Sequence, residues 1–128
     1  MRASQASLIA AIAIAGAGVV VAPRSSRAHA FPAAEQPMVG CTMNAVPAEV
    51  EIRFDNPIEA MFAHLQVSDK SGADVTADAP AVSEDRITLS VKLKPLAVGD
   101  YAVKWSVVAQ DSHRSEGSYT FTVAGSRD

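Results

Sequence analysis

The residues of this sequence that are best suited to chemistry are its three histidines, His29, His64 and His113. Asp111 stands two positions before His113, in a connection between two strongly patterned segments. If that backbone is extended, a spacing of two directs both side chains to the same side. An aspartate beside a histidine commonly binds a metal ion or orients an imidazole that does. Taken alone, such a pair is also typical of a solvated surface loop, and His64 is expected to be a structural or surface histidine.

The N-terminal segment has the pattern of an export signal. Arg2 precedes Leu8–Ala22, an unbroken run of apolar residues and glycine. A membrane-spanning helix needs about 20 such residues, whereas this shorter run fits the apolar region of a secretory signal peptide. Small residues allow cleavage after either Ala28 or Ala30, and an uncleaved membrane anchor is the alternative. We predict a secretory signal peptide over residues 1–28 and a mature chain that is not embedded in a membrane.

Cleavage after Ala28 would leave His29 as the first residue of the mature chain. His29 would then offer its α-amine and its imidazole Nδ1, which together chelate one ion in a compact ring. With the imidazole of His113 there are three nitrogen donors in a T-shape, an arrangement that suits Cu(II). Cleavage after Ala30 would remove this donor set, so secretion and metal binding depend on the same cut.

The composition indicates a small, acidic, globular domain. Of the 128 residues, 48% are hydrophobic and 20% are charged, which fits neither a disordered nor a collagen-like chain. The net charge of −3 argues against nucleic-acid binding, and loss of residues 1–28 would remove arginines but no acidic residue. The single cysteine, Cys41, excludes an internal disulfide and a cysteine-based zinc site. We expect its thiol to be buried and inert.

Alternating hydrophobicity predicts β-strands through the mature domain, residues 29–128. The expected strands lie within Glu49–Phe54, Ala63–Asp69, Arg86–Lys94, Tyr101–Ala109 and Ser118–Ala124. Each range alternates apolar and polar residues, as a strand with one buried face does. Short strands separated by turns at a spacing of roughly ten residues are typical of a Greek-key sandwich or barrel. Helical periodicity is limited to a single turn near Met61.

Several motifs of the mature chain resemble those of one known family. They are His29-Ala-Phe, Pro37-x-x-Gly40, Gly99-Asp-Tyr-Ala-Val-Lys-Trp105, Val107-Val-Ala-Gln-Asp-Ser-His113 and Gly117-Ser-Tyr-Thr-Phe-Thr-Val123. Together they resemble the CopC-type periplasmic copper-resistance proteins over nearly the whole mature chain. The resemblance implies an all-β, seven-stranded Greek-key barrel or sandwich of immunoglobulin-like or cupredoxin-like outline.

The resemblance also implies a metal site. One Cu(II) ion per chain would be held by the amine and imidazole of His29 and by the imidazole of His113, with Asp111 ligating weakly or orienting the site. The chain departs from the family at Asn56, which stands where many members have an acidic residue. Its methionines are scattered, so a Cu(I) site made of thioethers is not expected.

For function, the sequence predicts a periplasmic Cu(II) carrier or buffer that acts in copper resistance or uptake and is not an enzyme. We expect a monomer whose partner is an inner-membrane copper transporter or another periplasmic copper protein. Two alternatives stay open at this point. One is a monooxygenase-like enzyme that uses an N-terminal histidine brace for copper, and the other is a metal-free immunoglobulin-like interaction module.

Overall fold

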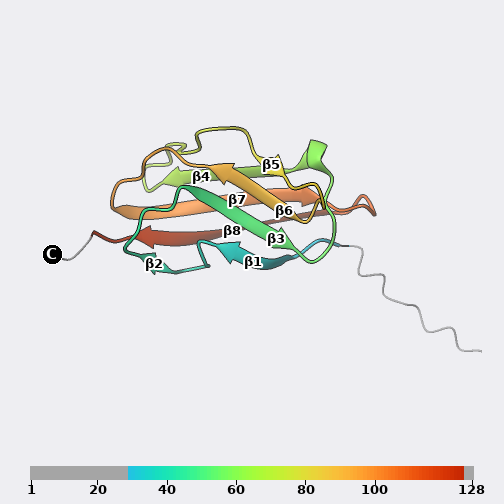
Figure 1. Cartoon of the computed structure of the whole chain (residues 1–128), viewed down its shortest axis with the longest axis horizontal. Helices are drawn as coiled ribbons and strands as arrows, with labels where there is room; N and C mark the ends of the chain where they lie inside the picture. Colours follow the sequence, from blue (N-terminus) through green and yellow to red (C-terminus); the bar gives the residue numbers. More distant parts are fainter. Residues whose placement is uncertain (1–28, 126–128) are drawn as a thin grey trace, which may run out of the picture.

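In a computed structural model that describes residues 29–125, the chain folds into two four-stranded β-sheets (Figure 1). The first sheet has the order β1 (Pro32–Gln36), β3 (Glu49–Phe54), β6 (Thr88–Lys92), β5 (Ala81–Val82). The second has the order β2 (Thr42–Met43), β8 (Arg114–Val123), β7 (Gly99–Val108), β4 (His64–Asp69). A single 3-10 turn, η1 (Ala60–Phe62), precedes β4. Within residues 29–125, no helix reaches the length and hydrophobicity that crossing a membrane requires.

The core lies between the two sheets and follows from the alternation of the sequence. In β3, Val50, Ile52 and Phe54 are buried, while Glu49 and Arg53 are exposed and Glu51 is half-buried. The other long strands follow the same rule, because successive side chains of a strand point to opposite faces. The fully buried large side chains are Phe54, Phe121, Ile52, Ile58, Leu89, Val50, Val67, Val103, Val107 and Val123. One aliphatic core with few aromatic rings therefore holds the two sheets together.

The prediction of an all-β sandwich is confirmed, and all five strands expected from alternation are present. The strand predicted at Glu49–Phe54 has those bounds, whereas β7 and β8 begin two and four residues earlier than expected. The described chain contains eight strands rather than seven, and β1, β2 and β5 were not expected from the pattern. β2 and β5 are only two residues long, and β1 has little apolar alternation.

One end of the sandwich brings together the start of the described chain and the connection between β7 and β8 (Figure 1). β1 runs antiparallel to β3, and Pro32 lies opposite Phe54, so the residues before β1 lie at the end of β3. The chain then continues from β3 to Ile58, which forms a bridge with Ala109. These pairings place residues 29–31 and the β7–β8 connection at the same end.

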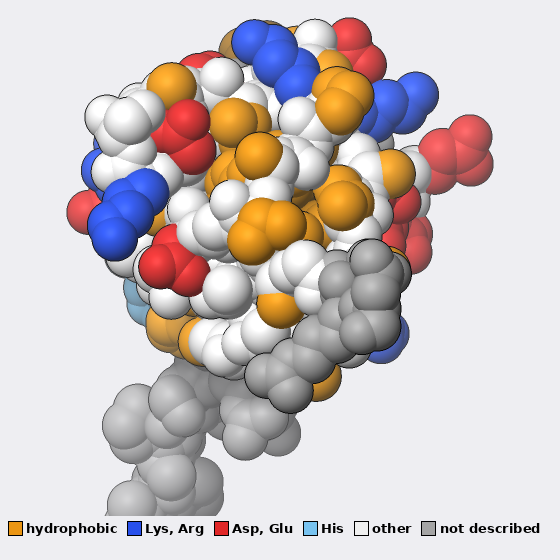
Figure 2. Space-filling model, turned by 90° about the vertical axis from the view of Figure 1, so that its left-hand side faces the viewer, with side chains coloured by type: hydrophobic (Ala, Val, Ile, Leu, Met, Phe, Trp, Pro, Cys, Tyr) orange, Lys and Arg blue, Asp and Glu red, His pale blue; other side chains and the backbone are white. Residues whose placement is uncertain are grey.

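The opposite end of the sandwich is different in character. Figure 2 shows hydrophobic side chains gathered at its centre, with acidic and basic side chains around them. Val46, in the connection from β2 to β3, and Val98, in the connection from β6 to β7, are among the exposed hydrophobic residues of the chain. The connections that carry Val46 and Val98 lie at the other end of the strands from residues 29–31.

A glycine in β8 is required by close packing between β7 and β8. Gly117 lies directly opposite Trp105, and a Cβ atom at Gly117 would sit 2.7 Å from Cζ2 of the indole ring. The ring also packs edge-on against Phe54, with ring centroids 5.3 Å apart. Because the Phe54 side chain is buried, the indole has little room to move away from β8. The glycine thus leaves the space that Trp105 occupies.

Replacement of Gly117 by alanine is expected to destabilise the fold. The added methyl group overlaps the indole, and overpacking of this kind typically costs about 1–3 kcal/mol. Urea denaturation should show this loss in the free energy of unfolding. Gly125→Ala is the control, since its Cβ would meet Val98 at an ordinary contact distance of 3.7 Å. Equal unfolding free energies for the two variants would contradict the close packing of Trp105.

Candidate metal centre

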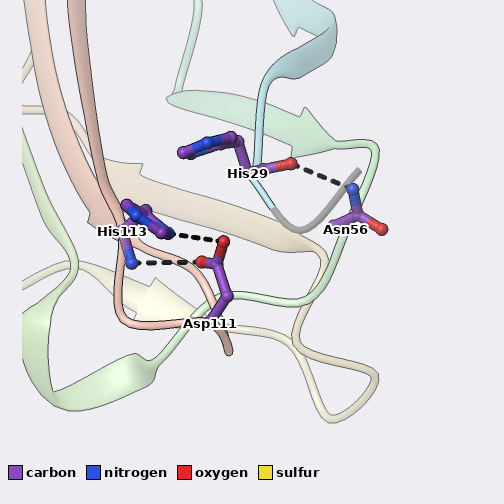
Figure 3. Close-up of polar contacts among 4 residues, drawn as sticks. All are labelled: His29, Asn56, Asp111 and His113. Atoms are coloured by element: carbon purple, nitrogen blue, oxygen red, sulfur yellow. Dashed lines mark hydrogen bonds and ion pairs between the residues drawn. The ribbon is translucent and has the colours of Figure 1, made fainter. Parts of the chain in front are cut away.

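His29, Asp111 and His113 converge at one end of the sandwich (Figure 3). His29 belongs to the segment before β1, whereas the other two lie in the connection between β7 and β8. Each residue offers one ligand atom, and these three atoms all lie within 4.8 Å of one another. The three residues singled out from the sequence are therefore brought together by the fold, although His29 and His113 are far apart in the chain.

The spacing of these atoms is close to what a single metal ion requires. For a metal–nitrogen bond of about 2.0–2.1 Å, as in zinc sites, two ligand atoms on one ion lie at most about 4.2 Å apart. The rings of His29 and His113 have centroids 4.5 Å apart and are tilted by 55°. His29 and His113 both lie outside the strands, so a small movement of the two rings can close the remaining gap. The arrangement can hold a small metal ion without a rearrangement of the sheets.

Asp111 holds His113 at two points (Figure 3). One carboxylate oxygen, Oδ1, accepts a hydrogen bond from the backbone N–H of His113 at 3.1 Å. The other, Oδ2, lies 2.7 Å from Nδ1 of the same residue. A ring nitrogen that donates to a carboxylate leaves the opposite nitrogen as the acceptor or metal ligand. The pair therefore directs Nε2 of His113 as the atom available to an ion.

Asp111 is charged in this environment. Its partial desolvation raises the pKa of the carboxyl group, but hydrogen bonds from the backbone and ring of His113 and electrostatic attraction to the rings of His113 and His29 lower it. The net pKa of Asp111 lies below its ordinary value. A carboxylate beside two imidazoles favours the binding of a cation at this end of the molecule.

The backbone between Asp111 and His113 forms a turn, which differs from the extended geometry considered in the sequence analysis. Ser112 has a φ of 70°, in the left-handed region that residues other than glycine rarely adopt. Its N–H donates to the carbonyl of Ala109 at 3.0 Å, and the N–H of Ala109 donates to the carbonyl of His113 at 3.0 Å. The turn, rather than strand alternation, is what brings the carboxylate to the imidazole.

The segment that carries His29 is held against the residues that follow β3. Ala30 is fully buried, so the residue next to His29 is anchored in the core. The side-chain N–H of Asn56 donates to the His29 carbonyl at 2.9 Å (Figure 3), and the N–H of Phe31 donates to Oδ1 of Asp55 at 2.8 Å. Sequence reasoning noted Asn56 as a departure from the family but did not identify these contacts. They depend on the pairing of β1 with β3, which the pattern of β1 does not reveal.

The group formed by His29, Asp111 and His113 includes neither His64 nor Cys41. His64 is exposed on β4 and is not a member of the group that includes His29. Cys41 is a free cysteine that is half-buried and packs against the core, so the expectation of a buried thiol is met in part. Met38 and Met61 are exposed, with 63% and 84% of their surface accessible.

Comparison with known proteins identifies the family. A family model for the CopC domain matches residues 33–124 of the chain. The copper transport protein CutJ of Bacillus subtilis is 31% identical over 107 residues, which is 82% of this chain but only 20% of CutJ. Protein YobA of Escherichia coli K12 is 30% identical over 98 residues, covering 75% of this chain and 79% of YobA. The chain thus spans only a fifth of the longer of these two relatives.

Solved structures agree with the sequence comparisons. CopC from Methylosinus trichosporium OB3b superposes with a TM-score of 0.72 and 29% identity, over 78% of this chain and 98% of that one. PcoC, a methionine-rich copper resistance protein from Escherichia coli, superposes with a TM-score of 0.66 and 26% identity, over 76% of this chain and all of PcoC. The two-sheet sandwich, the matched residues and these relatives lead to one conclusion: the chain belongs to the CopC family.

Proposed function

We propose that this protein binds one Cu(II) ion per chain and acts as a copper carrier or buffer outside the cytoplasm. The observation that carries the proposal is the convergence of His29, Asp111 and His113, whose ligand atoms lie within 4.8 Å of one another. Imidazole nitrogens are good ligands for Cu(II), and a planar set of nitrogen donors suits its preferred geometry. Membership of the CopC family, whose relatives include proteins named for copper transport and copper resistance, supports the choice of copper.

In this proposal each residue has a distinct role. His29 contributes its α-amine and its imidazole as a chelate, and His113 contributes Nε2. Asp111 orients His113, a role supported by the hydrogen bonds that both of its carboxylate oxygens accept from that residue. An imidazole oriented in this way is a better ligand than a freely rotating one, because its tautomer and its direction are fixed in advance.

The chelate requires export and cleavage. We propose that residues 1–28 are a secretory signal peptide and that cleavage after Ala28 exposes the amine of His29. This segment lies outside the described residues, so the proposal rests on the apolar run Leu8–Ala22 and on the small residues at the cleavage position. The amine exists only after cleavage, which would confine copper binding to the exported form in the periplasm.

Copper held in this way is accessible to a partner. The His113 side chain is 64% exposed and Asp111 20% exposed, so the site faces solvent at the end of the sandwich. We propose that a monomer exchanges copper with an inner-membrane copper transporter or with another periplasmic copper protein. An exposed site allows a partner to replace one ligand at a time, which a buried site would prevent.

A carrier fits the distribution of aromatic side chains better than the monooxygenase-like alternative does. Oxidation of a polysaccharide would need a broad surface of exposed aromatic rings near the copper ion. Here Tyr101 and Tyr119 are buried and Trp105 packs against the core, which leaves Phe31 and Phe62 as the exposed aromatic residues. We therefore propose a binding protein rather than an enzyme.

Extension of the mature N-terminus tests the chelate. One additional residue ahead of His29 converts the amine into an amide and moves the new amine out of the ring. Cu(II) affinity, measured by competition with a chelator of known affinity, should fall by orders of magnitude. One residue added after Asp128 serves as the control and should have no effect. Unchanged affinity after the N-terminal addition would exclude the proposed geometry.

Substitution of the histidines tests the assignment of the second imidazole. His113→Ala should weaken Cu(II) binding strongly, while His64→Ala, which removes an exposed histidine of β4, should leave it unchanged. Asp111→Ala should lower Cu(II) affinity by about 10–100-fold, which is less than the loss of either histidine ligand, if the carboxylate acts by orienting His113. Isothermal titration of the mature variants measures all three. An equal loss in the two histidine variants would contradict the assignment.

Acidification should release the copper. Protons compete with the metal ion for the amine and the imidazoles, so affinity falls as the pH falls. The pKa of Asp111 lies below its ordinary value, so its carboxylate stays charged while the nitrogen ligands take up protons. Copper affinity should therefore decrease steadily below neutral pH in competition titrations. An affinity that is constant from about pH 7 to pH 4 would be incompatible with nitrogen ligands.

A further inference from the structure

The two residues that follow β3 hold the backbone on both sides of Ala30, and we infer that Asp55 and Asn56 form a clasp that positions His29 for the metal ion. The inference rests on the proposed function, because it concerns the same ion. Neither residue is part of the group of potential ligands formed by His29, Asp111 and His113. The clasp would act through the backbone of His29 and Phe31 and not by ligation.

The contacts that make up the clasp are directed at main-chain atoms. The side-chain N–H of Asn56 donates to the carbonyl of His29 at 2.9 Å, and Oδ1 of Asp55 accepts from the N–H of Phe31 at 2.8 Å. The backbone N–H of Asp55 donates in turn to the Phe31 carbonyl at 2.9 Å. Asn56 also donates to Oδ1 of Asp55 at 3.5 Å, which links the two side chains. With Ala30 buried between them, three successive residues are fixed.

The chemistry of the two positions matches what the backbone offers. A carbonyl oxygen needs a donor, which the amide of Asn56 supplies and which an ionised carboxylate cannot. A backbone N–H needs an acceptor, which the carboxylate of Asp55 supplies. An acidic residue in place of Asn56 would set a negative charge against the His29 carbonyl oxygen. The neutral amide at this position is therefore suited to holding the chain rather than to binding the ion.

A clasp of this kind matters because the first residues of a domain are usually poorly ordered unless they are tied down. After cleavage, His29 would be the chain end, and a chelate on a mobile end must lose conformational freedom when it binds an ion. Hydrogen bonds that already hold residues 29–31 reduce that cost, as preorganisation does in other binding sites. His29 would then lie beside His113 before copper arrives. The distance of 4.5 Å between the two ring centroids fits this arrangement.

The test compares four variants of the mature protein beginning at His29. Asp55→Ala removes the acceptor of the Phe31 N–H, and Asn56→Ala removes the donor to the His29 carbonyl. Each should weaken Cu(II) binding by about 10-fold, at the lower end of the range for groups that orient ligands. Asp55→Asn keeps an acceptor oxygen and should restore most of the affinity. Asp74→Ala is the matched control. Asp74 also accepts a hydrogen bond from a backbone N–H, that of Thr76, at 2.8 Å, but it lies beside Ser68, at the other end of β4 from His64.

A second measurement separates positioning from general stability. In the metal-free protein, the Phe31 amide should exchange its hydrogen faster in Asp55→Ala than in the unaltered chain, while core amides of β7 and β8 keep their protection. The Cu(II) EPR lines of Asp55→Ala and Asn56→Ala should broaden, because His29 would sample more than one position. The Asp74→Ala and Asp55→Asn proteins should show neither change.

The outcomes separate this inference from the proposed function. Tight copper binding by the unaltered protein together with undiminished affinity in both alanine variants would overturn the clasp and leave the copper site standing. Loss of affinity in Asp74→Ala equal to that in Asp55→Ala would also overturn it, since the effect would then be unspecific. Failure of the unaltered mature protein to bind Cu(II) would refute the proposed function itself, and with it the role of the clasp.

Discussion

The pairing of β1 with β3 is the constraint on which the site depends. It lays the first described residues along the end of β3, and the bridge between Ile58 and Ala109 keeps that end beside the β7–β8 connection. His29 thereby meets His113, although more than half of the chain separates them in sequence. The long β7–β8 ladder, which runs from Gly99 to Val108 on one strand, fixes the position of the second imidazole. Without either pairing, the two rings would have no reason to be neighbours.

Within this frame the two halves of the site are positioned by different means. His113 is oriented from its own loop, by a turn through Ser112 and by both oxygens of Asp111. His29 is held from outside, by contacts of Asp55 and Asn56 with its neighbouring backbone. A loop between two paired strands can supply its own rigidity, whereas a chain end needs support from another segment. The position of His29 therefore depends on residues outside the group formed by His29, Asp111 and His113.

The sequence was informative where local patterns decide the structure. Alternation predicted the strands that form the core, including β3 with its bounds, because one buried face imposes a period of two. The motif around Asp111 and His113 predicted their proximity, although the backbone achieves it by a turn and not by extension. β1 could not be predicted, since its residues carry little alternation and its position is set by its partner β3. For the same reason the contacts of Asn56 with His29 were not foreseen: they arise from register between distant segments.

In the proposed site, two imidazoles and one terminal amine hold a single cupric ion. Pulsed EPR of the exported protein, loaded with one equivalent of Cu(II), measures this most directly, because it counts the imidazole rings coupled to the electron spin. Two coupled imidazoles are expected, with selective loss of one of them in His113→Ala. A spectrum with one imidazole or none in the unaltered protein, or with two that survive replacement of His113, would contradict the proposed site.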